Sequence, residues 1–163
     1  MSDRPHLQLS LRPLRAKDVS IMADLAVAAG MFTDDEKGFL EESAQRWLAQ
    51  AESSSRWVVA EGEEGVVGVA FFEPREATDR VWYLTMIVVH PKLQGAGIGR
   101  RLLEHCEEAL RGERQRLLLV ETSSTDKYSG TRRFYARLGF DEVACIPDYF
   151  EEGDGMVLFW KKL

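Results

Sequence analysis

The sequence has few cysteines and no long apolar run. Cys106 and Cys145 are too few for a disulfide framework, and their apolar surroundings predict reduced side chains in the core of a cytoplasmic protein. Apolar runs such as Leu117–Val120 are far shorter than the roughly 18 residues that indicate a membrane span. The opening residues, MSDRPHLQLSLRPL, contain no apolar core of a secretory signal. We therefore expect a cytoplasmic protein with no membrane partner.

The sequence also lacks an excess of basic residues and any group of residues spaced as metal ligands. The chain has 21 Lys and Arg against 27 Asp and Glu, a net charge of -6, which argues against a general nucleic-acid binder because such proteins carry a basic excess. Since no His, Cys, Asp or Glu residues have the spacing of metal ligands, we expect no metal. Any positively charged site must therefore be local.

The length of 163 residues suits one domain, and no repeat or low-complexity linker divides the chain. We therefore expect a single domain over 1–163. Apolar periodicity predicts helices at 18–29, 33–48, 98–112 and 130–138. It predicts strands at 7–12, 56–61, 66–73, 81–90, 116–121, 140–146 and 156–161, the last two joined by a long tip at 147–155. The order βααβββαβαββ indicates a mixed α/β sheet covered by helices.

The segment 88–101 is the most informative part of the sequence. A predicted strand enters a glycine-rich loop that opens directly into a helix. Glycines let the backbone approach a ligand closely, and the first N–H groups of a helix attract anions. No acidic residue lies between Pro91 and Leu103. The segment therefore predicts a site for a phosphate or pyrophosphate, formed by the glycines and nearby cations Gly95, Gly97, Gly99, Lys92, Arg100 and Arg101.

Three nucleotide-loop patterns can be compared with this segment. A P-loop needs Lys and then Ser or Thr after its last glycine, whereas two arginines follow Gly99. A dinucleotide fingerprint needs a third glycine where Arg100 stands. The acidic Glu121 at the end of the next strand gives the dinucleotide-binding interpretation a little support, but too little chain follows for a Rossmann sheet. The pattern that fits is Gln/Arg-x-x-Gly-x-Gly/Ala, met by Gln94, Gly97 and Gly99.

A second motif, Thr131 to Phe140, places Phe134 and Tyr135 on a short helix followed by Gly139 and Phe140. Together the two motifs resemble the GNAT superfamily of N-acetyltransferases, in particular a bacterial branch of it. The resemblance implies a mostly antiparallel, twisted sheet of about seven strands flanked by four helices and splayed between the fourth and fifth strands. It also implies acetyl-CoA as co-substrate and direct transfer of the acetyl group to a primary amine in a ternary complex.

The resemblance implies a role for particular residues. Backbone groups of Ile87, Val88 and Val89 would bind the pantetheine arm, and Tyr135 would assist the departing thiolate. The pyrophosphate would bind the backbone amides of Gln94, Gly95, Ala96, Gly97, Ile98, Gly99 and Arg100. Tyr128 and Thr131 stand where relatives often have Asn and Ala. The alternative function is a non-catalytic module that binds acyl-CoA and regulates a partner.

An amine acceptor must lose a proton before it attacks, because most amines are charged at pH 7. Glu121, at the end of a predicted strand, is our candidate base; Glu73 and Asp148 are alternatives. Tyr83 fits an acceptor channel, the core and the surface equally well. The acidic and aromatic stretches 31–36 and 147–155 would favour a cationic amine. We expect a small-molecule or peptide amine as partner, and the sequence is compatible with a homodimer.

Overall fold

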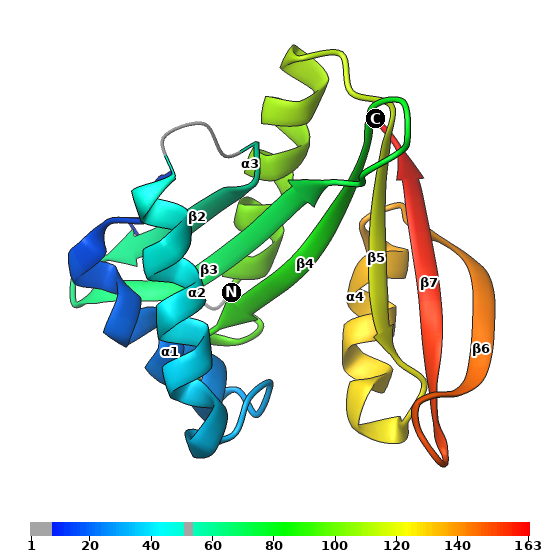
Figure 1. Cartoon of the computed structure of the whole chain (residues 1–163), viewed down its shortest axis with the longest axis horizontal. Coiled ribbons are helices and arrows are strands. Elements are labelled where there is room, and N and C mark those ends of the chain that lie inside the picture. Colours follow the sequence, from blue (N-terminus) through cyan, green and yellow to red (C-terminus); the bar gives the residue numbers. More distant parts are fainter. Residues whose placement is uncertain (1–7, 51–53) are drawn as a thin grey trace, which may run out of the picture. The chain divides into compact units, whose positions relative to one another are not determined.

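The computed structural model describes residues 8–50 and 54–163. Its helices and strands follow the predicted order (Figure 1). The predicted first strand began at Leu7, which lies outside the described residues. The elements are β1 (Ser10–Pro13), α1 (Val19–Ala28), α2 (Lys37–Ala49), β2 (Arg56–Gly62), β3 (Gly65–Pro74), β4 (Val81–Val89), α3 (Ile98–Gly112), β5 (Leu117–Ser123), α4 (Ser129–Arg137), β6 (Asp141–Glu151) and β7 (Asp154–Lys162).

The strands form a sheet in the order β1-β2-β3-β4-β5-β7-β6. The strand pairs β1–β2, β5–β7 and β6–β7 are antiparallel, whereas β4 and β5 are parallel. The register of this parallel pair covers only Val81 to Tyr83 against Leu117 to Leu119, although β4 continues to Val89 and β5 to Ser123. The predicted seven-stranded mixed sheet, splayed between its fourth and fifth strands, is confirmed.

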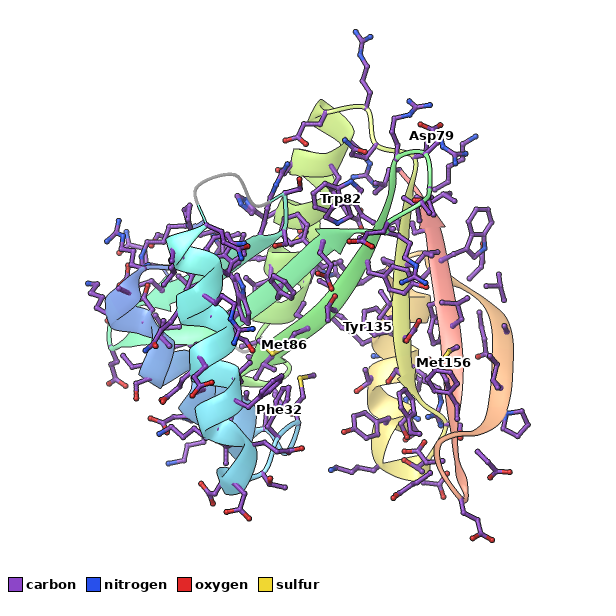
Figure 2. The ribbon with its side chains drawn as sticks, in the orientation of Figure 1. Phe32, Asp79, Trp82, Met86, Tyr135 and Met156 are labelled. Carbon is purple, nitrogen blue, oxygen red and sulfur yellow. The ribbon has the colours of Figure 1, made fainter. Side chains whose placement is uncertain are left out.

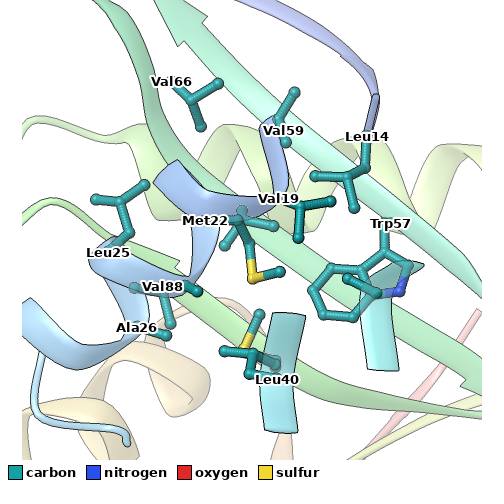
Figure 3. Packing of buried hydrophobic residues seen from close by; sticks show 14 residues of the cluster. Leu14, Val19, Met22, Leu25, Ala26, Leu40, Trp57, Val59, Val66 and Val88 are labelled. Carbon is teal, nitrogen blue, oxygen red and sulfur yellow. The ribbon is translucent and has the colours of Figure 1, made fainter. Parts of the chain in front are cut away.

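The chain forms two compact units. The first contains the described residues up to Phe71 together with Met86–His105, and the second contains Phe72–Thr85 and Cys106–Leu163. In the first unit, apolar side chains of α1 and α2 pack on β2, β3 and the end of β4 (Figure 3). Met22, Ala23 and Ala26 of α1 are fully buried because the helical repeat places them on one face.

A buried ion pair fixes β1 to the start of α1 in this unit. The Arg12 guanidinium donates to both Asp18 oxygens, at 2.7 and 3.1 Å, and to both Glu61 oxygens, at 2.8 and 2.9 Å. Asp18 is only 2% exposed. Replacing Arg12 by Met leaves this carboxylate buried without its cation, so we expect a loss of about 3–5 kcal/mol from the free energy of unfolding. Urea unfolding at neutral pH measures this loss.

The Arg12–Asp18 pair also predicts how the stability difference between wild type and Arg12→Met depends on pH. The pKa of Asp18 lies below its usual value, chiefly because of the hydrogen bonds from Arg12. Its stabilising contribution is therefore complete above the unfolded-state pKa and is lost as the pH falls through the lower folded-state pKa. The difference in the free energy of unfolding between wild type and Arg12→Met should therefore become smaller as the pH falls below about 4. Glu61→Gln serves as control, because Glu61 is more exposed; an equal loss in both variants would contradict the role given to Asp18.

In the second unit, a buried carboxylate connects α3, α4 and β7. Glu107 of α3 is 3% exposed and accepts hydrogen bonds from Lys161 at 2.7 and 2.9 Å and from Arg111 at 2.7 Å. Lys161 also donates to the carbonyl oxygen of Leu138, just after α4, at 2.7 Å. Three hydrogen bonds from two cationic side chains thus satisfy a carboxylate that would be costly to bury alone. This cluster fixes the C-terminal end of α4 within the unit.

Two sequence-based expectations are wrong. Cys106 is buried as predicted, but Cys145 is exposed because it lies on β6, at the edge of the sheet. The predicted long tip at 147–155 is mostly strand: β6 continues to Glu151 and β7 begins at Asp154. Pro147 has no N–H group to donate, which an edge strand tolerates because only one of its sides has a neighbouring strand. The register also shifts between Ile146 and Glu151, around this proline.

Candidate active site

The predicted pyrophosphate loop joins β4 to α3 in the first unit. Gly95 and Gly97 have φ values of 81° and 86°, in the left-handed region that side chains with a Cβ rarely adopt. A Cβ added at either position would meet no other atom within 4 Å. Both glycines are exposed, and among the described residues no atom beyond their chain neighbours occupies the space beside them. A ligand can approach this backbone directly.

The N-terminus of α3 provides the donors that an anion needs. Arg101 N donates to Gly97 O at 3.1 Å, the first bond of the helix, so the N–H groups of Ile98, Gly99 and Arg100 have no intrahelical partner. The Ile98 side chain is 1% exposed and anchors the helix start in the core. Only the backbone of Ile98 can therefore contact a ligand. Arg100 adds an exposed positive charge.

Two hydrogen bonds shape the path from β4 into this loop. His90 N donates to Val67 O at 2.9 Å, which keeps the end of β4 beside β3. The Gln94 side-chain amide donates to Val89 O at 3.5 Å. Val88 is buried, whereas Ile87 and Val89 are half-buried. Gln94 therefore helps to hold the loop against the strand end, a contact that the motif alone does not reveal.

Tyr135 lies on α4 in the second unit (Figure 2). It is 3% exposed, and its ring packs near Phe134, Phe140 and Phe159, with centroid distances of 5.2, 5.6 and 5.8 Å. Burial raises the pKa of its phenol far above the usual value. The phenol is therefore a protonated hydrogen-bond donor throughout the physiological range.

A polar network that the sequence analysis missed positions the start of α4. Arg132, one helical turn before Tyr135, donates to the carbonyl oxygens of Ser123 and Thr125 at 2.7 and 2.9 Å. The Ser123 hydroxyl donates to Asp154 at 2.6 Å. These bonds tie α4 to the end of β5 and to β7. No spacing pattern signals this network, because its members come from three separate segments.

The three candidate bases differ in their surroundings. Glu73 accepts a hydrogen bond from the Thr85 hydroxyl at 3.0 Å, and Asp148 accepts one from Gly153 N at 2.8 Å across the β6–β7 turn. Glu121 is exposed on β5, and its charge is the second cause, after burial, of the raised pKa of the Tyr83 phenol. Glu121 and Tyr135 therefore both belong to the second unit, whereas the glycine loop belongs to the first.

Comparison with known families decides the kind of protein. The sequence model of the acetyltransferase (GNAT) domain matches residues 53–142, which include the glycine loop, Glu121 and Tyr135. The chain belongs to the GNAT acetyltransferases. As such it is an N-acetyltransferase, and the resemblance inferred from its two motifs is confirmed.

Solved structures agree with this GNAT assignment. A GNAT-family protein from Desulfovibrio desulfuricans is 29% identical, with a TM-score of 0.87, over 95% of this chain and 99% of that chain. Two structures share the fold at lower identity. The YncA protein of Salmonella typhimurium, solved with acetyl-CoA, is 21% identical (TM-score 0.73), and the ribosomal-protein-S18-alanine N-acetyltransferase of Escherichia coli is 20% identical (TM-score 0.75). Each alignment covers 95% of this chain and 94% of the other.

A search of curated proteins found no significant match. Within residues 8–50 and 54–163, no helix has both the length and the apolar character needed to cross a membrane. Nor does this part of the chain bring together three or more His, Cys, Asp or Glu side chains that could hold a metal ion.

Proposed function

We propose that this GNAT enzyme transfers the acetyl group of acetyl-CoA to a primary amine by direct attack in a ternary complex, with 1–163 working as one domain. The observation that carries the proposal is the glycine loop, whose exposed backbone leads into the first N–H groups of α3, which have no partner within the helix. A coenzyme A pyrophosphate carries the charge and the acceptor oxygens that such a site binds. The loop therefore fits the donor substrate.

Specific groups would hold this donor. Backbone amides from Gln94 to Arg100 would bind the pyrophosphate. Strand residues from Ile87 to Val89 would bind the pantetheine arm through their backbone, as a short β4–β5 ladder permits. When bound, acetyl-CoA supplies a thioester carbonyl for the amine to attack. The YncA structure, which contains acetyl-CoA on the same fold, supports this assignment.

Acid–base groups of the second unit would complete the reaction. Glu121 is exposed and can accept the amine proton directly or through water. As the new nitrogen–carbon bond forms, the carbon–sulfur bond breaks and the sulfur takes up the electron pair. The Tyr135 phenol, kept protonated by burial, donates a hydrogen bond or its proton to that thiolate. Acid and base are thus separate residues.

The acceptor would be a cationic amine. Tyr149 and Phe150 on β6 are 52% and 50% exposed, and acidic side chains flank them at Asp148, Glu151 and Glu152. Such a surface attracts positive charge. Structures of this fold are named for acceptors as different as an alanine of a ribosomal protein and an aminoglycoside. Both small amines and peptides are therefore candidates.

A panel of amines, amino acids and peptides tests the proposal through release of free coenzyme A thiol. We expect at least one acceptor to be turned over, with intersecting lines in initial-velocity plots, because both substrates bind before transfer. Cys145→Ala, which removes the exposed thiol, should retain full activity. Parallel lines, or an acetyl group trapped on Cys145, would contradict direct transfer. Binding of acetyl-CoA without turnover of any amine would favour the non-catalytic module.

A further inference from the structure

Arg132 joins α4 to the end of β5 within the second unit. Its Nη1 atom donates to the carbonyl oxygens of Ser123 and Thr125 at 2.7 and 2.9 Å. Ser123 is 7% exposed, and its hydroxyl donates to Asp154, the first residue of β7, at 2.6 Å. The Thr125 N–H group donates to the Ser123 hydroxyl oxygen at 3.1 Å. Both carbonyl groups that accept from Arg132 therefore belong to a turn that is itself hydrogen-bonded.

Ser124, between these two residues, is held to β7 from the other side. Its N–H group donates to the carbonyl oxygen of Gly155 at 2.7 Å, and its hydroxyl accepts from the Gly155 N–H group at 2.8 Å. A Cβ added to Gly155 would lie only 2.8 Å from the carbonyl oxygen of Ile146, so the chains are in close contact here. A polar network with its groups paired in this way is rigid. The segment 123–125 is thus a fixed anchor for Arg132.

The helix that Arg132 attaches to this anchor is short and is held at both ends. α4 has nine residues, and Lys161 donates to the carbonyl oxygen of Leu138, just after it, at 2.7 Å. Tyr135 lies three residues after Arg132, one turn along the same face of the helix. Lys161 also neutralises a buried carboxylate, whereas both bonds of Arg132 go to neutral carbonyl oxygens. Replacing Arg132 therefore leaves no buried carboxylate without its cation.

The aromatic contacts of Tyr135 do not by themselves fix its hydroxyl. Its ring centroid lies 5.6 Å from that of Phe140 and 5.8 Å from that of Phe159. Aromatic pairs are favourable over centroid distances of about 4.5–7 Å, so such contacts tolerate a shift of about 1 Å. Hydrogen bonds weaken steeply outside a narrow range of lengths and angles. The bonds of Arg132 therefore define the position of α4, and with it that of the hydroxyl, more sharply than the rings do.

We propose that Arg132 is a positioning residue, whose hydrogen bonds to the segment 123–125 place the Tyr135 hydroxyl for the transfer step. The inference rests on the proposed function, in which Tyr135 assists the departing thiolate. A misplacement of about 1 Å costs on the order of 10²-fold in rate. Because Arg132 donates to carbonyl groups of the protein, its effect on the reaction passes through Tyr135.

A double-mutant cycle tests this role, with acetyl-CoA and the best acceptor from the amine panel. Arg132→Met should lower kcat about 10- to 100-fold and leave the KM for acetyl-CoA unchanged. In Tyr135→Phe the same substitution should lower kcat little further, because the hydroxyl that Arg132 positions is already gone. A purely structural role predicts the same fold-change in both backgrounds. If Arg132→Met does not fold, Arg132→Gln, which keeps an amide donor, replaces it in the cycle.

Arg137→Met is the matched control, because it removes the same charge from an exposed position at the end of the same helix. We expect it to keep wild-type kcat. Equal fold-changes in the two backgrounds, or wild-type kcat in folded Arg132→Met, overturn the positioning role and leave the proposed function intact. Wild-type kcat in Tyr135→Phe overturns the positioning role together with the role of Tyr135. A wild-type protein that acetylates no amine overturns the proposed function as well.

Discussion

Replacing Gly97 by glutamate is expected to abolish the rise in melting temperature that acetyl-CoA gives the wild-type protein. A ligand that binds only the folded state at a hundred times its Kd adds about 2.7 kcal/mol of stability, or roughly 5–10 °C for a domain of this size. The glutamate side chain would occupy the open space beside the loop backbone and oppose the anion with a like charge. Thermal unfolding with and without acetyl-CoA measures the effect.

A matched control separates the loss of binding from backbone strain. Gly153, in the β6–β7 turn, has a φ of 84°, close to the 86° of Gly97, and it too has no atom within 4 Å of an added Cβ. Gly153→Glu therefore carries the same strain and the same added charge outside the loop. We expect it to lower the melting temperature of the free protein as Gly97→Glu does, while keeping the full rise with acetyl-CoA. A rise that persists in folded Gly97→Glu would contradict the donor site.

Local sequence signals were sufficient to predict the order of elements. Apolar periodicity and glycine or proline stops are properties of short segments, and they located the ends of α3 and β5 to within two residues. The glycine loop could likewise be predicted, because the residues that would bind the pyrophosphate are consecutive in the sequence. The family resemblance then supplied the splay between β4 and β5, which no local pattern encodes.

Features that depend on pairing between distant segments were missed. The exposure of Cys145 follows from the position of β6 at the sheet edge, and an apolar pattern alone cannot tell an edge strand from a central one. The placement of Tyr83 and Glu121 on one face of the sheet depends on the register of two parallel strands, and a slip of one residue would put them on opposite faces. The sequence therefore offered Glu121 as a base without showing that Tyr83 lies on the same face of the sheet.

Tyr135→Phe is expected to lower kcat by about 10²–10⁴, the usual cost of losing an acid–base group. Phenylalanine keeps the ring that packs near Phe134, Phe140 and Phe159 and removes only the hydroxyl. The rise in melting temperature with acetyl-CoA should remain, because the backbone of the glycine loop is unaltered. Steady-state kinetics with the best panel amine, measured across the pH range, give the fall in kcat.

The competing hypothesis is that Tyr135 serves packing alone, and burial to 3% exposure makes that hypothesis a serious one. It predicts near-normal turnover in Tyr135→Phe with a small change in stability. Phe140→Leu provides the complementary control, because it disturbs the same ring cluster and leaves the phenol in place. If the hydroxyl assists the thiolate, Phe140→Leu lowers the melting temperature more than Tyr135→Phe does, while kcat falls far less. Wild-type kcat in Tyr135→Phe at every pH would instead assign Tyr135 to the core and leave water to protonate the thiolate.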